Sequence, residues 1–391
     1  MRIGFISYEY PSFVYGGAGV YSKNIVEHLA KRGHDVHVFT FSDDASADPN
    51  ITVHKIGNAR LPKLLWIPSY WLGLRKCFRR DGAALGLDVI IGNGFSELPL
   101  CKGIVDVPRI LVMHQSARRV IRIVGPTLLE RLQNINNEMG LAPLFDPILV
   151  KRADKVVAVS DFVKKSLVED LNLEPRLIEV VHNGFNDFYE PLDEKETERW
   201  KRERGLSEER LLLFVGRVND KRKGLMELIK AFSMVECGLG GHLLVVGGGD
   251  QGPAKALAAE LGLESRVTML GKVSDDELRT LYTICDIYVS SSFYESFGLT
   301  LVEAMSCKKP VIARDIGGIG EVVSDENGLL LRDRSVGAMA DAITEMLKHH
   351  EKYADKGEGN RAYAIEKFSW ARAAESMERI AIGLTEDRKC G

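Results

Sequence analysis

Short runs of apolar, often β-branched residues recur along the chain and alternate with longer segments of helical periodicity. Continuous apolar runs are typical of parallel strands that are buried on both faces of a sheet. The helical segments between them favour β-α-β units. The predicted strands are 2–7, 36–40, 51–56, 88–91, 109–113, 155–159, 177–181, 211–216, 242–246, 267–273, 286–289, 310–313 and 328–331, and the last sixty residues predict three helices.

The length of the chain indicates more than one folding unit. A chain of 391 residues is too long for one ordinary core and predicts two domains of about 150–200 residues each. The fold class is therefore α/β, with two Rossmann-like domains that face a central cleft where we expect the substrate. We place the linker between them near residues 186–192, where the sequence is charged and irregular.

Composition excludes several other classes of protein. The net charge is −3, and no apolar run approaches the roughly 20 residues that span a bilayer. The first seven residues enter a strand pattern directly and lack the anatomy of a signal peptide. The six cysteines form no C-x-x-C pair, which fits reduced thiols in a cytoplasmic protein and argues against a metal site.

Charge is unevenly distributed along the chain, and residues 49–80 are the clearest case. This segment has no acidic residue, and its basic and aromatic residues are Lys55, Arg60, Lys63, Arg75, Lys76, Arg79, Arg80, Trp66, Trp71 and Phe78. One interpretation is a peripheral contact with an anionic membrane on its inner face, which would suit a lipid acceptor. The alternative is a solvated helix whose aromatic side chains lie in the core.

A strand, a tight loop and a helix follow one another near the carboxyl end, across residues 286–307. The loop contains Glu295, Gly298 begins the helix, and Glu303 lies inside it. The first amides of a helix have no internal partners and suit a bound phosphate, whereas carboxylates accept hydrogen bonds from sugar hydroxyls. This spacing alone is also compatible with a surface loop and a solvated helix carboxylate.

Further candidates stand at the ends of predicted strands, where ligands of parallel α/β sheets collect. The first strand is followed by a glycine loop, Gly16 to Gly19, and the fifth by His114. Asn183 and Gly184 mark a turn after the seventh strand. For the glycines and the histidine, a purely structural role is the alternative.

A basic loop from Arg217 to Gly224 follows the first strand of the second half and includes Lys223. Cations at this sheet edge suit an anionic ligand, and Arg and Lys can stabilise a departing diphosphate in place of a metal. The chain has no Asp-x-Asp stretch. A nearby Gly247-x-Gly249-x-x-Gly252 pattern matches a dinucleotide fingerprint, but no acidic residue closes the next strand, so we do not predict a nicotinamide or flavin site.

Taken in order, these motifs resemble the retaining glycosyltransferases of family 4, also called glycosyl transferases group 1, which have the GT-B fold. The resemblance covers nearly the whole chain. Its pieces are Gly16-Gly-Ala-Gly-Val-Tyr21, His114, Asn183-Gly184, Gly216-Arg217 with Lys223-Gly224, Val-Val-Gly-Gly-Gly249, Glu295 with Glu303, and Gly317-Gly318-x-x-Glu321.

The resemblance implies a sugar transfer from a nucleotide-diphosphate sugar, as co-substrate, with no metal and no other cofactor. Arg217 and Lys223 would contact the diphosphate, Glu295 the donor sugar, Glu303 the ribose, and His114 the sugar near the reaction centre. The implied catalytic set is His114, Arg217, Lys223 and Glu295. The implied donor-binding set is Gly16, Gly17, Gly19, Asn183, Gly216, Gly249, Phe297, Gly298, Leu299 and Glu303.

The resemblance also implies a domain organisation. Residues 1–187 would form an acceptor-side domain and residues 188–370 a nucleotide-sugar domain, with a final helix, residues 371–391, that crosses back to the first. The acceptor stays undetermined (lipid, glycan or small molecule), and no nucleic acid is expected as a partner. His114 is followed by Gln115 and Ser116 rather than the acidic residue of many members.

Two alternatives stay open from the sequence. One is a non-catalytic protein that binds nucleotide sugars, although the catalytic groups implied by the family are intact. The other is a different GT-B enzyme, such as a nucleotide-sugar epimerase or a phosphorylase, and for the latter no pyridoxal phosphate lysine is identified.

Overall fold

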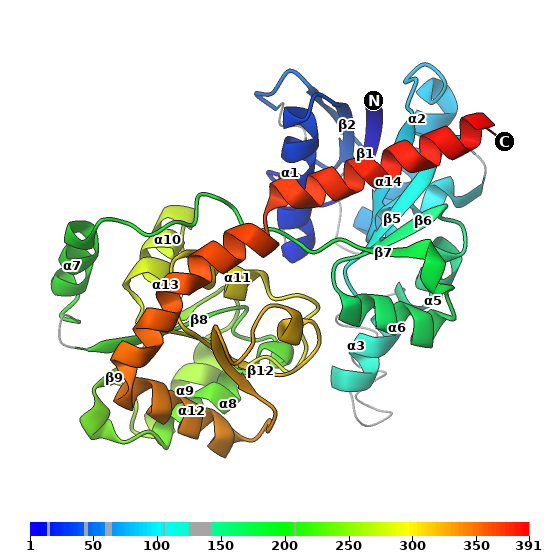
Figure 1. Cartoon of the computed structure of the whole chain (residues 1–391). Helices are drawn as coiled ribbons and strands as arrows, with labels where there is room; N and C mark the ends of the chain where they lie inside the picture. The colour runs from blue at the N-terminus through cyan, green and yellow to red at the C-terminus, as the bar shows by residue number, and fades with distance from the viewer. Residues whose placement is uncertain are drawn as a thin grey trace. The chain divides into compact units, whose positions relative to one another are not determined.

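The chain folds into two compact units (Figure 1). The computed structural model describes residues 1–13, 16–42, 46–58, 65–102, 104, 106–124, 142–206 and 209–390. Unit 1 contains residues 1–184 together with 370–391, and unit 2 contains residues 185–369. Each unit has its own parallel sheet, as the prediction of two Rossmann-like domains requires.

Unit 1 is built on a seven-stranded parallel sheet with the strand order β3-β2-β1-β4-β5-β6-β7. The order reverses between β1 and β4, which is the switch point where ligands of doubly wound sheets bind. The central strands are buried along their whole length because helices cover both faces. The strands are β1 (Arg2–Ile6), β2 (Asp35–Thr40), β3 (Ile51–Lys55), β4 (Val89–Asn93), β5 (Arg109–Met113), β6 (Lys155–Ala158) and β7 (Ile178–Val180).

The helices of unit 1 fall into two groups by their contacts. The first and last helices of the chain pack together, and the others contact one another through the short 3-10 segment η2 (Gly94–Lys102) or directly. The helices are α1 (Gly17–Lys31), α2 (Trp66–Asp81), α3 (Ala117–Val124), α5 (Ala142–Val150), α6 (Asp161–Leu171) and α14 (Trp370–Cys390). Of the helical region predicted for residues 117–152, residues 125–141 lie outside the described part.

Unit 2 repeats the same plan with six parallel strands in the order β10-β9-β8-β11-β12-β13. Its switch point lies between β8 and β11. The strands are β8 (Arg210–Val215), β9 (Gly241–Val246), β10 (Val267–Gly271), β11 (Ile287–Ser290), β12 (Val311–Arg314) and β13 (Gly328–Leu331). The thirteen strands of both units coincide, to within two residues at each end, with the predicted runs.

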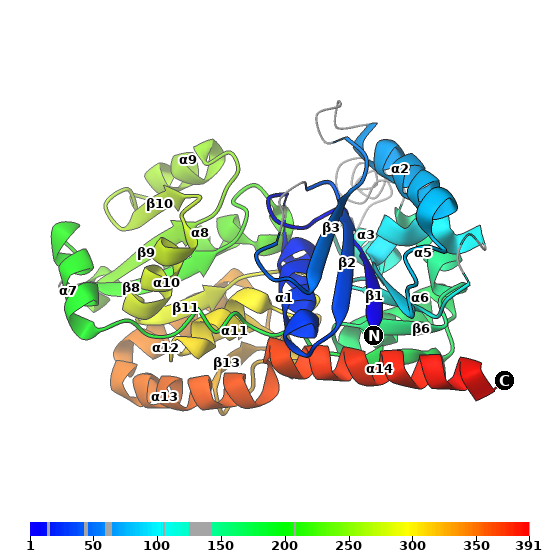
Figure 2. The same ribbon diagram turned by 90° about the horizontal axis from the view of Figure 1, so that it is seen from above.

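The helices of unit 2 also cover both faces of its sheet, and Figure 2 shows α12 and α13 side by side. A core of fully buried Leu, Ile, Val and Phe residues fills the space under α8, α9 and α12, and each such side chain stabilises the fold by about 1.5–3 kcal/mol. The helices are α7 (Glu194–Glu203), α8 (Leu225–Ser233), α9 (Gly252–Glu260), α10 (Asp275–Ile284), α11 (Leu299–Ser306), α12 (Val336–Lys348) and α13 (His350–Lys367).

The segment predicted as a linker, residues 186–192, is part of unit 2 rather than a free connection. Tyr189 is buried and packs against Tyr282 with ring centroids 5.5 Å apart. The hydroxyl of Ser306 donates a hydrogen bond to the carbonyl oxygen of Tyr189 at 2.7 Å. The boundary between the units, at Gly184 and Phe185, directly precedes the segment predicted as the linker.

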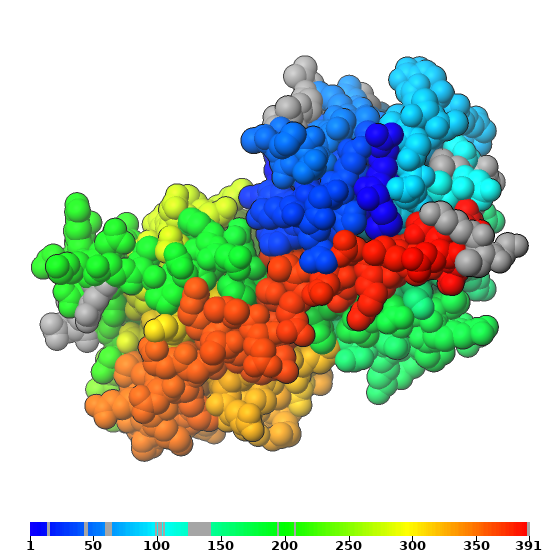
Figure 3. All heavy atoms as spheres, turned by 45° about the horizontal axis from the view of Figure 1, so that its top comes forward, coloured from blue at the N-terminus to red at the C-terminus, as the bar shows by residue number. Residues whose placement is uncertain are grey.

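The final helix, α14, belongs to unit 1 and lies along α1, as the space-filling view shows (Figure 3). Its Glu378 accepts a hydrogen bond from Arg32 and lies 2.9 Å from Nε2 of His34. Trp370, the first residue of α14, is buried against Tyr21. Polar contacts of Glu378 and an aromatic contact of Trp370 therefore both hold α14 against the rest of unit 1.

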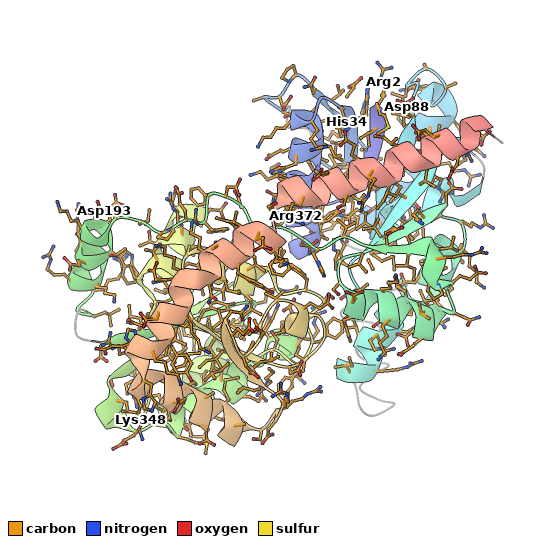
Figure 4. The ribbon with its side chains drawn as sticks, in the orientation of Figure 1. Arg2, His34, Asp88, Asp193, Lys348 and Arg372 are labelled. Carbon is orange, nitrogen blue, oxygen red and sulfur yellow. The ribbon has the colours of Figure 1, made fainter. Side chains whose placement is uncertain are left out.

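Polar contacts close the amino-terminal edge of the unit 1 sheet. The backbone N–H of Arg2 donates to Asp88 at 2.7 Å, and the guanidinium of Arg2 pairs with Asp35 at 2.8 Å; Arg2 and Asp88 are labelled in Figure 4. The opposite, carboxyl-terminal edge carries the candidate site. In the described part of the chain, no helix is both long and apolar enough to cross a bilayer.

Candidate active site

The structure groups the predicted site residues into two clusters, one in each unit. The Glu295 cluster of unit 2 lies at the carboxyl ends of β8 and β11 and includes Arg217, Lys223 and Glu295, and Glu303 lies in the helix α11 that follows. The His114 cluster of unit 1 lies at the carboxyl ends of β1, β4 and β5 and includes His114 and the glycine loop. Asn183 lies in unit 1 as well, buried, and its Oδ1 has no hydrogen-bond partner among the residues that the structure describes.

Lys223 and Glu295 form a direct ion pair. The Nζ atom of Lys223 lies 2.7 Å from Oε2 of Glu295, and the two side chains are 26% and 20% exposed. These residues are 72 positions apart in the sequence, and the order of β8 and β11 in the sheet brings them together. The cation assigned to the diphosphate and the carboxylate assigned to the sugar are therefore neighbours.

The loop that carries Glu295 is held by two glycines. The N–H of Gly318 donates to the carbonyl oxygen of Glu295 at 3.0 Å. A Cβ atom on Gly317, whose φ is +58°, would lie 1.8 Å from the same oxygen, and one on Gly318 would lie 2.3 Å from the oxygen of Ser296. The Gly317-Gly318 motif therefore supports the Glu295 loop through close backbone contact.

Gly298 begins α11 in the left-handed region, with φ of +105°, and no side chain caps the helix. The amides of Leu301 and Val302 bond to the carbonyl of Gly298, whereas those of Leu299 and Thr300 precede the first such bond. Uncapped amides and the positive end of the helix dipole favour an anion at this point. Phe297 is buried just before it and packs edge-on against Phe368 at 5.4 Å.

Glu303 is the second carboxylate of the predicted pair, and it is buried inside α11. The hydroxyl of Tyr282 donates a hydrogen bond to its Oε2 at 2.8 Å. Burial raises the pKa of Glu303 to about 7, although the hydrogen bond from Tyr282 by itself lowers this pKa. The charge of this carboxyl therefore changes near neutral pH.

The basic loop after β8 is partly neutralised by an acid that sequence reasoning overlooked. Buried Asp220 accepts two hydrogen bonds from the guanidinium of Arg222 and pairs with Arg217 at 3.2 Å. Burial would raise the pKa of Asp220, but the contacts with Arg222 and the charge of Arg217 hold it below its ordinary value. Arg217 keeps a side chain that is 60% exposed, so it remains accessible to a ligand.

The glycines of the second half support this basic loop. A Cβ on Gly247 would lie 1.8 Å from the carbonyl oxygen of Gly216, and one on Gly249 would lie 2.5 Å from Oδ1 of Asn219. Gly216 itself faces the side chain of Lys223. The fingerprint-like glycines thus serve close packing of two loops within unit 2.

A buried arginine that the sequence analysis did not single out holds the Lys223 backbone. The guanidinium of Arg314, fully buried at the end of β12, donates to the carbonyl oxygen of Ser291. The hydroxyl of Ser291 donates in turn to the carbonyl oxygen of Lys223 at 2.9 Å. Arg314 and Ser291 therefore position the lysine of the ion pair.

In unit 1, the glycine loop is shorter than predicted because α1 begins at Gly17 rather than Val20. The amides of Gly19 and Val20 already bond to the carbonyl oxygen of Gly16, so Gly17 and Gly19 lie in the first helical turn. The N–H of Gly16 donates to Glu9 at 3.2 Å. The helix start thus stands at the carboxyl end of β1.

His114 follows β5 and is partly buried. Its Nε2 lies 2.7 Å from Oδ1 of Asn93, and its ring packs edge-on against Tyr21 at 4.9 Å. Burial lowers the pKa of His114 to about 4, so the imidazole is neutral at pH 7. Asn93 was not predicted, although a polar residue at the end of a buried strand was a signal that could have found it.

Within the described part of either unit, metal ligands do not gather. Among the described residues of each unit taken by itself, no three His, Cys, Asp or Glu ligand atoms lie within 4.8 Å of one another. The expectation that the site works without a metal remains a prediction.

Two family models match the chain and together cover most of it. Residues 15–187 match the model described as Glycosyltransferase Family 4, and residues 196–363 match the model described as Glycosyl transferases group 1. The chain belongs to this glycosyltransferase family. The family assignment predicted from the motifs is confirmed.

Relatives of the glycosyltransferase support the assignment. A D-inositol 3-phosphate glycosyltransferase from Corynebacterium aurimucosum is 29% identical, over 93% of this chain and 90% of its own. A sucrose-phosphate synthase from Thermosynechococcus elongatus has the same fold, with a TM-score of 0.83, 22% identity and coverage of 99% and 100%. Anabaena HepE, solved in complex with UDP-glucose, gives a TM-score of 0.75 at 22% identity, over 98% of this chain and all of that one.

Proposed function

We propose that this glycosyltransferase moves a sugar from a nucleoside-diphosphate sugar to an acceptor, with retention of anomeric configuration and without a divalent metal. The observation that carries the proposal is the Lys223–Glu295 pair at 2.7 Å beside the uncapped start of α11. A cation and free helix amides suit the diphosphate, and the adjoining carboxylate suits the sugar attached to it.

In this proposal each charged group has a separate task. Arg217 and Lys223 stabilise the negative charge that grows on the leaving diphosphate, as preorganised donors do in other enzymes. Glu295 accepts hydrogen bonds from the donor sugar. Glu303 accepts hydrogen bonds from the ribose.

The reaction is proposed to follow a front-face route. The bond between the anomeric carbon and the phosphate oxygen breaks, and a bond from the acceptor oxygen to that carbon forms on the same face. The departing phosphate accepts the proton of the acceptor hydroxyl. Exclusion of water from the site protects the sugar from hydrolysis during this step.

The donor is tested by a thermal-shift panel of UDP, GDP, ADP and their sugar conjugates, with magnesium and with EDTA. A ligand at 100 times its Kd stabilises a protein by about 2.7 kcal/mol, which raises the melting temperature measurably. One nucleotide that binds equally well in EDTA supports the proposal, and HepE makes UDP-glucose the first conjugate to test. A flat panel excludes the nucleotide-sugar site.

Turnover separates the proposal from a sugar-nucleotide sensor or an epimerase. A transferase releases free nucleoside diphosphate only when acceptor is present, whereas an epimerase changes the sugar without release. The anomeric proton coupling of the product, measured by NMR, then reports retention or inversion. An inverted product would exclude the front-face route.

The outer face of α2 supports a second proposal, which concerns the surface on which the acceptor is presented. Tyr70 and Phe78 point into the core of unit 1, as the alternative interpretation of residues 49–80 predicted. The outward stripe of the helix instead contains Leu72, which is 71% exposed, followed by exposed Lys76 and Arg79. Arg60 and Lys63 of the same segment lie outside the described residues.

A second helix of unit 1, α5, also has exposed apolar residues and contacts α2. Trp71 of α2 packs edge-on against Phe145 of α5 at 5.4 Å, which places the two helices in contact. On the outer face of α5, Leu144 is 67% exposed and Ile148 43%. We propose that this surface rests on an anionic lipid bilayer, since apolar side chains enter the interface and each nearby basic residue contributes about 1 kcal/mol.

Flotation tests the surface independently of catalysis. We expect binding to vesicles that contain phosphatidylserine at low salt, and none to pure phosphatidylcholine. The variants Leu72→Glu and Arg79→Glu should each weaken binding severalfold, whereas Met234→Glu, at a similarly exposed apolar residue of unit 2 (63% against 71% for Leu72), serves as the matched control. Absence of binding by the unmodified protein would overturn the surface proposal and leave the transferase proposal intact.

A further inference from the structure

The side chains of Asn93, Ser7, Ser22 and His114 form a hydrogen-bond network in unit 1. The side-chain amide of Asn93, at the end of β4, is its centre. Its Nδ2 lies 2.8 Å from Oγ of Ser22, 3.2 Å from Oγ of Ser7 and 3.2 Å from the carbonyl oxygen of Ala18. Its Oδ1 lies 2.7 Å from Nε2 of His114.

The surroundings determine which way the Asn93 amide points. A backbone carbonyl can only accept a hydrogen bond, so the group that faces the oxygen of Ala18 must be the amide NH₂. The hydroxyl of Ser7 donates to the carbonyl oxygen of Glu9 at 2.8 Å, so its Oγ is an acceptor toward Asn93. With the NH₂ directed to these acceptors, the oxygen of the amide faces His114.

The orientation of the amide determines the tautomer of the histidine. An amide oxygen is only an acceptor, and the 2.7 Å contact therefore requires a proton on Nε2 of His114. In the neutral ring, the other nitrogen, Nδ1, is then unprotonated and presents a lone pair. Within the described residues, Nδ1 has no hydrogen-bond partner in this structure.

We propose that Asn93 is a positioning residue that holds His114 as the Nε2–H tautomer, so that Nδ1 accepts a hydrogen bond from a hydroxyl of the bound sugar or acceptor. The inference rests on the proposed function only for the identity of that hydroxyl. His114 touches the substrate, and Asn93 acts through it.

The packing around the ring supports a single orientation. Tyr21 lies edge-on to His114 at 4.9 Å, and Trp370 lies edge-on to Tyr21 at 5.7 Å. Burial raises the pKa of the Tyr21 hydroxyl, so the titratable group against the ring is neutral. Asn93, Ser7 and Ser22 carry no charge either, and the pKa of His114 is lowered by burial alone.

The cost of losing the contact follows from burial. Asn93 is buried, so removing its carbonyl leaves the Nε2–H of His114 without an acceptor and frees the ring to change tautomer. Groups that orient a histidine in this way typically change affinity or activity by about 10–100-fold when they are lost, as at metal sites. We expect a decrease of that size in kcat for Asn93→Leu, with little change in KM for the donor.

The first test reads the tautomer directly, without any activity. In the full-length protein labelled with ¹⁵N-histidine, the His114 signal is assigned by its loss in His114→Gln. Long-range ¹H–¹⁵N spectra at pH 7 should show Nε2 protonated and Nδ1 unprotonated. A ring protonated at Nδ1, or at both nitrogens, would overturn the proposal.

Two variants then separate positioning from a merely structural role. Asn93→Asp keeps an acceptor but adds a negative charge, which favours imidazolium; the pH below which kcat falls should therefore rise by at least one unit. Ser22→Ala is the matched control, because it removes one bond to Asn93 but leaves the carbonyl of Ala18 to orient the amide. Its His114 spectrum should match that of the unmodified protein.

Failure of this inference differs from failure of the proposed function. If no nucleotide sugar is turned over, the proposed function falls while the spectra still report the tautomer. If turnover is normal in a folded Asn93→Leu protein whose His114 has changed tautomer, the positioning role is excluded and the transferase assignment stands.

Discussion

Exchanging the charges of the Lys223–Glu295 pair separates its structural role from its proposed role in catalysis. At 2.7 Å, the attraction between two unit charges is about 6 kcal/mol for an effective dielectric constant near 20. Desolvation and lost side-chain freedom offset most of that in a pair that is only partly buried. We therefore expect Lys223→Ala to destabilise unit 2 by about 1 kcal/mol, which corresponds to a decrease of about 2–4 °C in melting temperature.

The expected effect on turnover is larger than the effect on stability. If Lys223 stabilises the leaving diphosphate, its loss removes about 2–4 kcal/mol of transition-state stabilisation, or roughly 30- to 1,000-fold in kcat/KM. The swapped double variant Lys223→Glu with Glu295→Lys restores an ion pair. It places a carboxylate where the diphosphate is proposed to bind and an ammonium where the sugar is proposed to bind. Calorimetry should show that the swap recovers melting temperature, while steady-state assays show that activity stays at the level of Lys223→Ala. Recovery of activity in the swap would refute the assignment, because the pair would then act only by holding its loop.

Three further predictions follow from the same geometry. Burial raises the pKa of Glu303 to about 7, so its neutral form is favoured as pH falls and its ionised form as pH rises. Because the ionised carboxylate is the form proposed to accept the ribose hydrogen bonds, the nucleotide affinity measured by calorimetry should increase from pH 6 to pH 8, and Glu303→Gln should abolish that pH dependence. Ionisation of a buried carboxyl destabilises the fold, so Glu303→Gln should also raise the melting temperature more at pH 8 than at pH 6. Gly317→Ala, at φ +58° and against a backbone oxygen, should destabilise unit 2 by about 2–5 kcal/mol in denaturant titrations, whereas Gly359→Ala, in α13 with open space around it, should stabilise by about 0.5–1 kcal/mol; equal effects would contradict the packing argument. Arg217→Ala should decrease kcat/KM by about 30- to 1,000-fold in the same assay, while Arg202→Ala, on the exposed face of α7, should change it less than twofold.

The fold could be predicted from the sequence because its strands are fully buried. A strand such as β4 or β5 has helices on both faces, so its sequence is a continuous apolar run that is easy to recognise. The end of each apolar run also predicts where the loop at the carboxyl end of the strand begins. The parallel order of the strands then places Arg217, Lys223 and Glu295 at one edge of the unit 2 sheet.

What the sequence could not supply are contacts between side chains that lie far apart in the chain. Asp220 stands among four basic residues, and only the structure shows that the guanidinium of Arg222 donates its hydrogen bonds to Asp220 rather than to a ligand. In the sequence, Tyr282 is typical of a core position of its helix, and only the structure shows that its hydroxyl donates a hydrogen bond to Glu303. Local periodicity does not encode such pairs, because they depend on how the elements pack.

The discontinuity of unit 1 has a consequence for how the enzyme is synthesised. Its two segments are separated in the chain by all of unit 2, and Trp370, which packs on Tyr21 beside His114, belongs to the second segment. On a ribosome, unit 2 is complete and able to fold once residue 369 has emerged, while unit 1 still waits for α14. The packing of Trp370 on Tyr21, beside His114, is thus the last part to form, so a nascent chain can acquire its Glu295 cluster before that packing is complete.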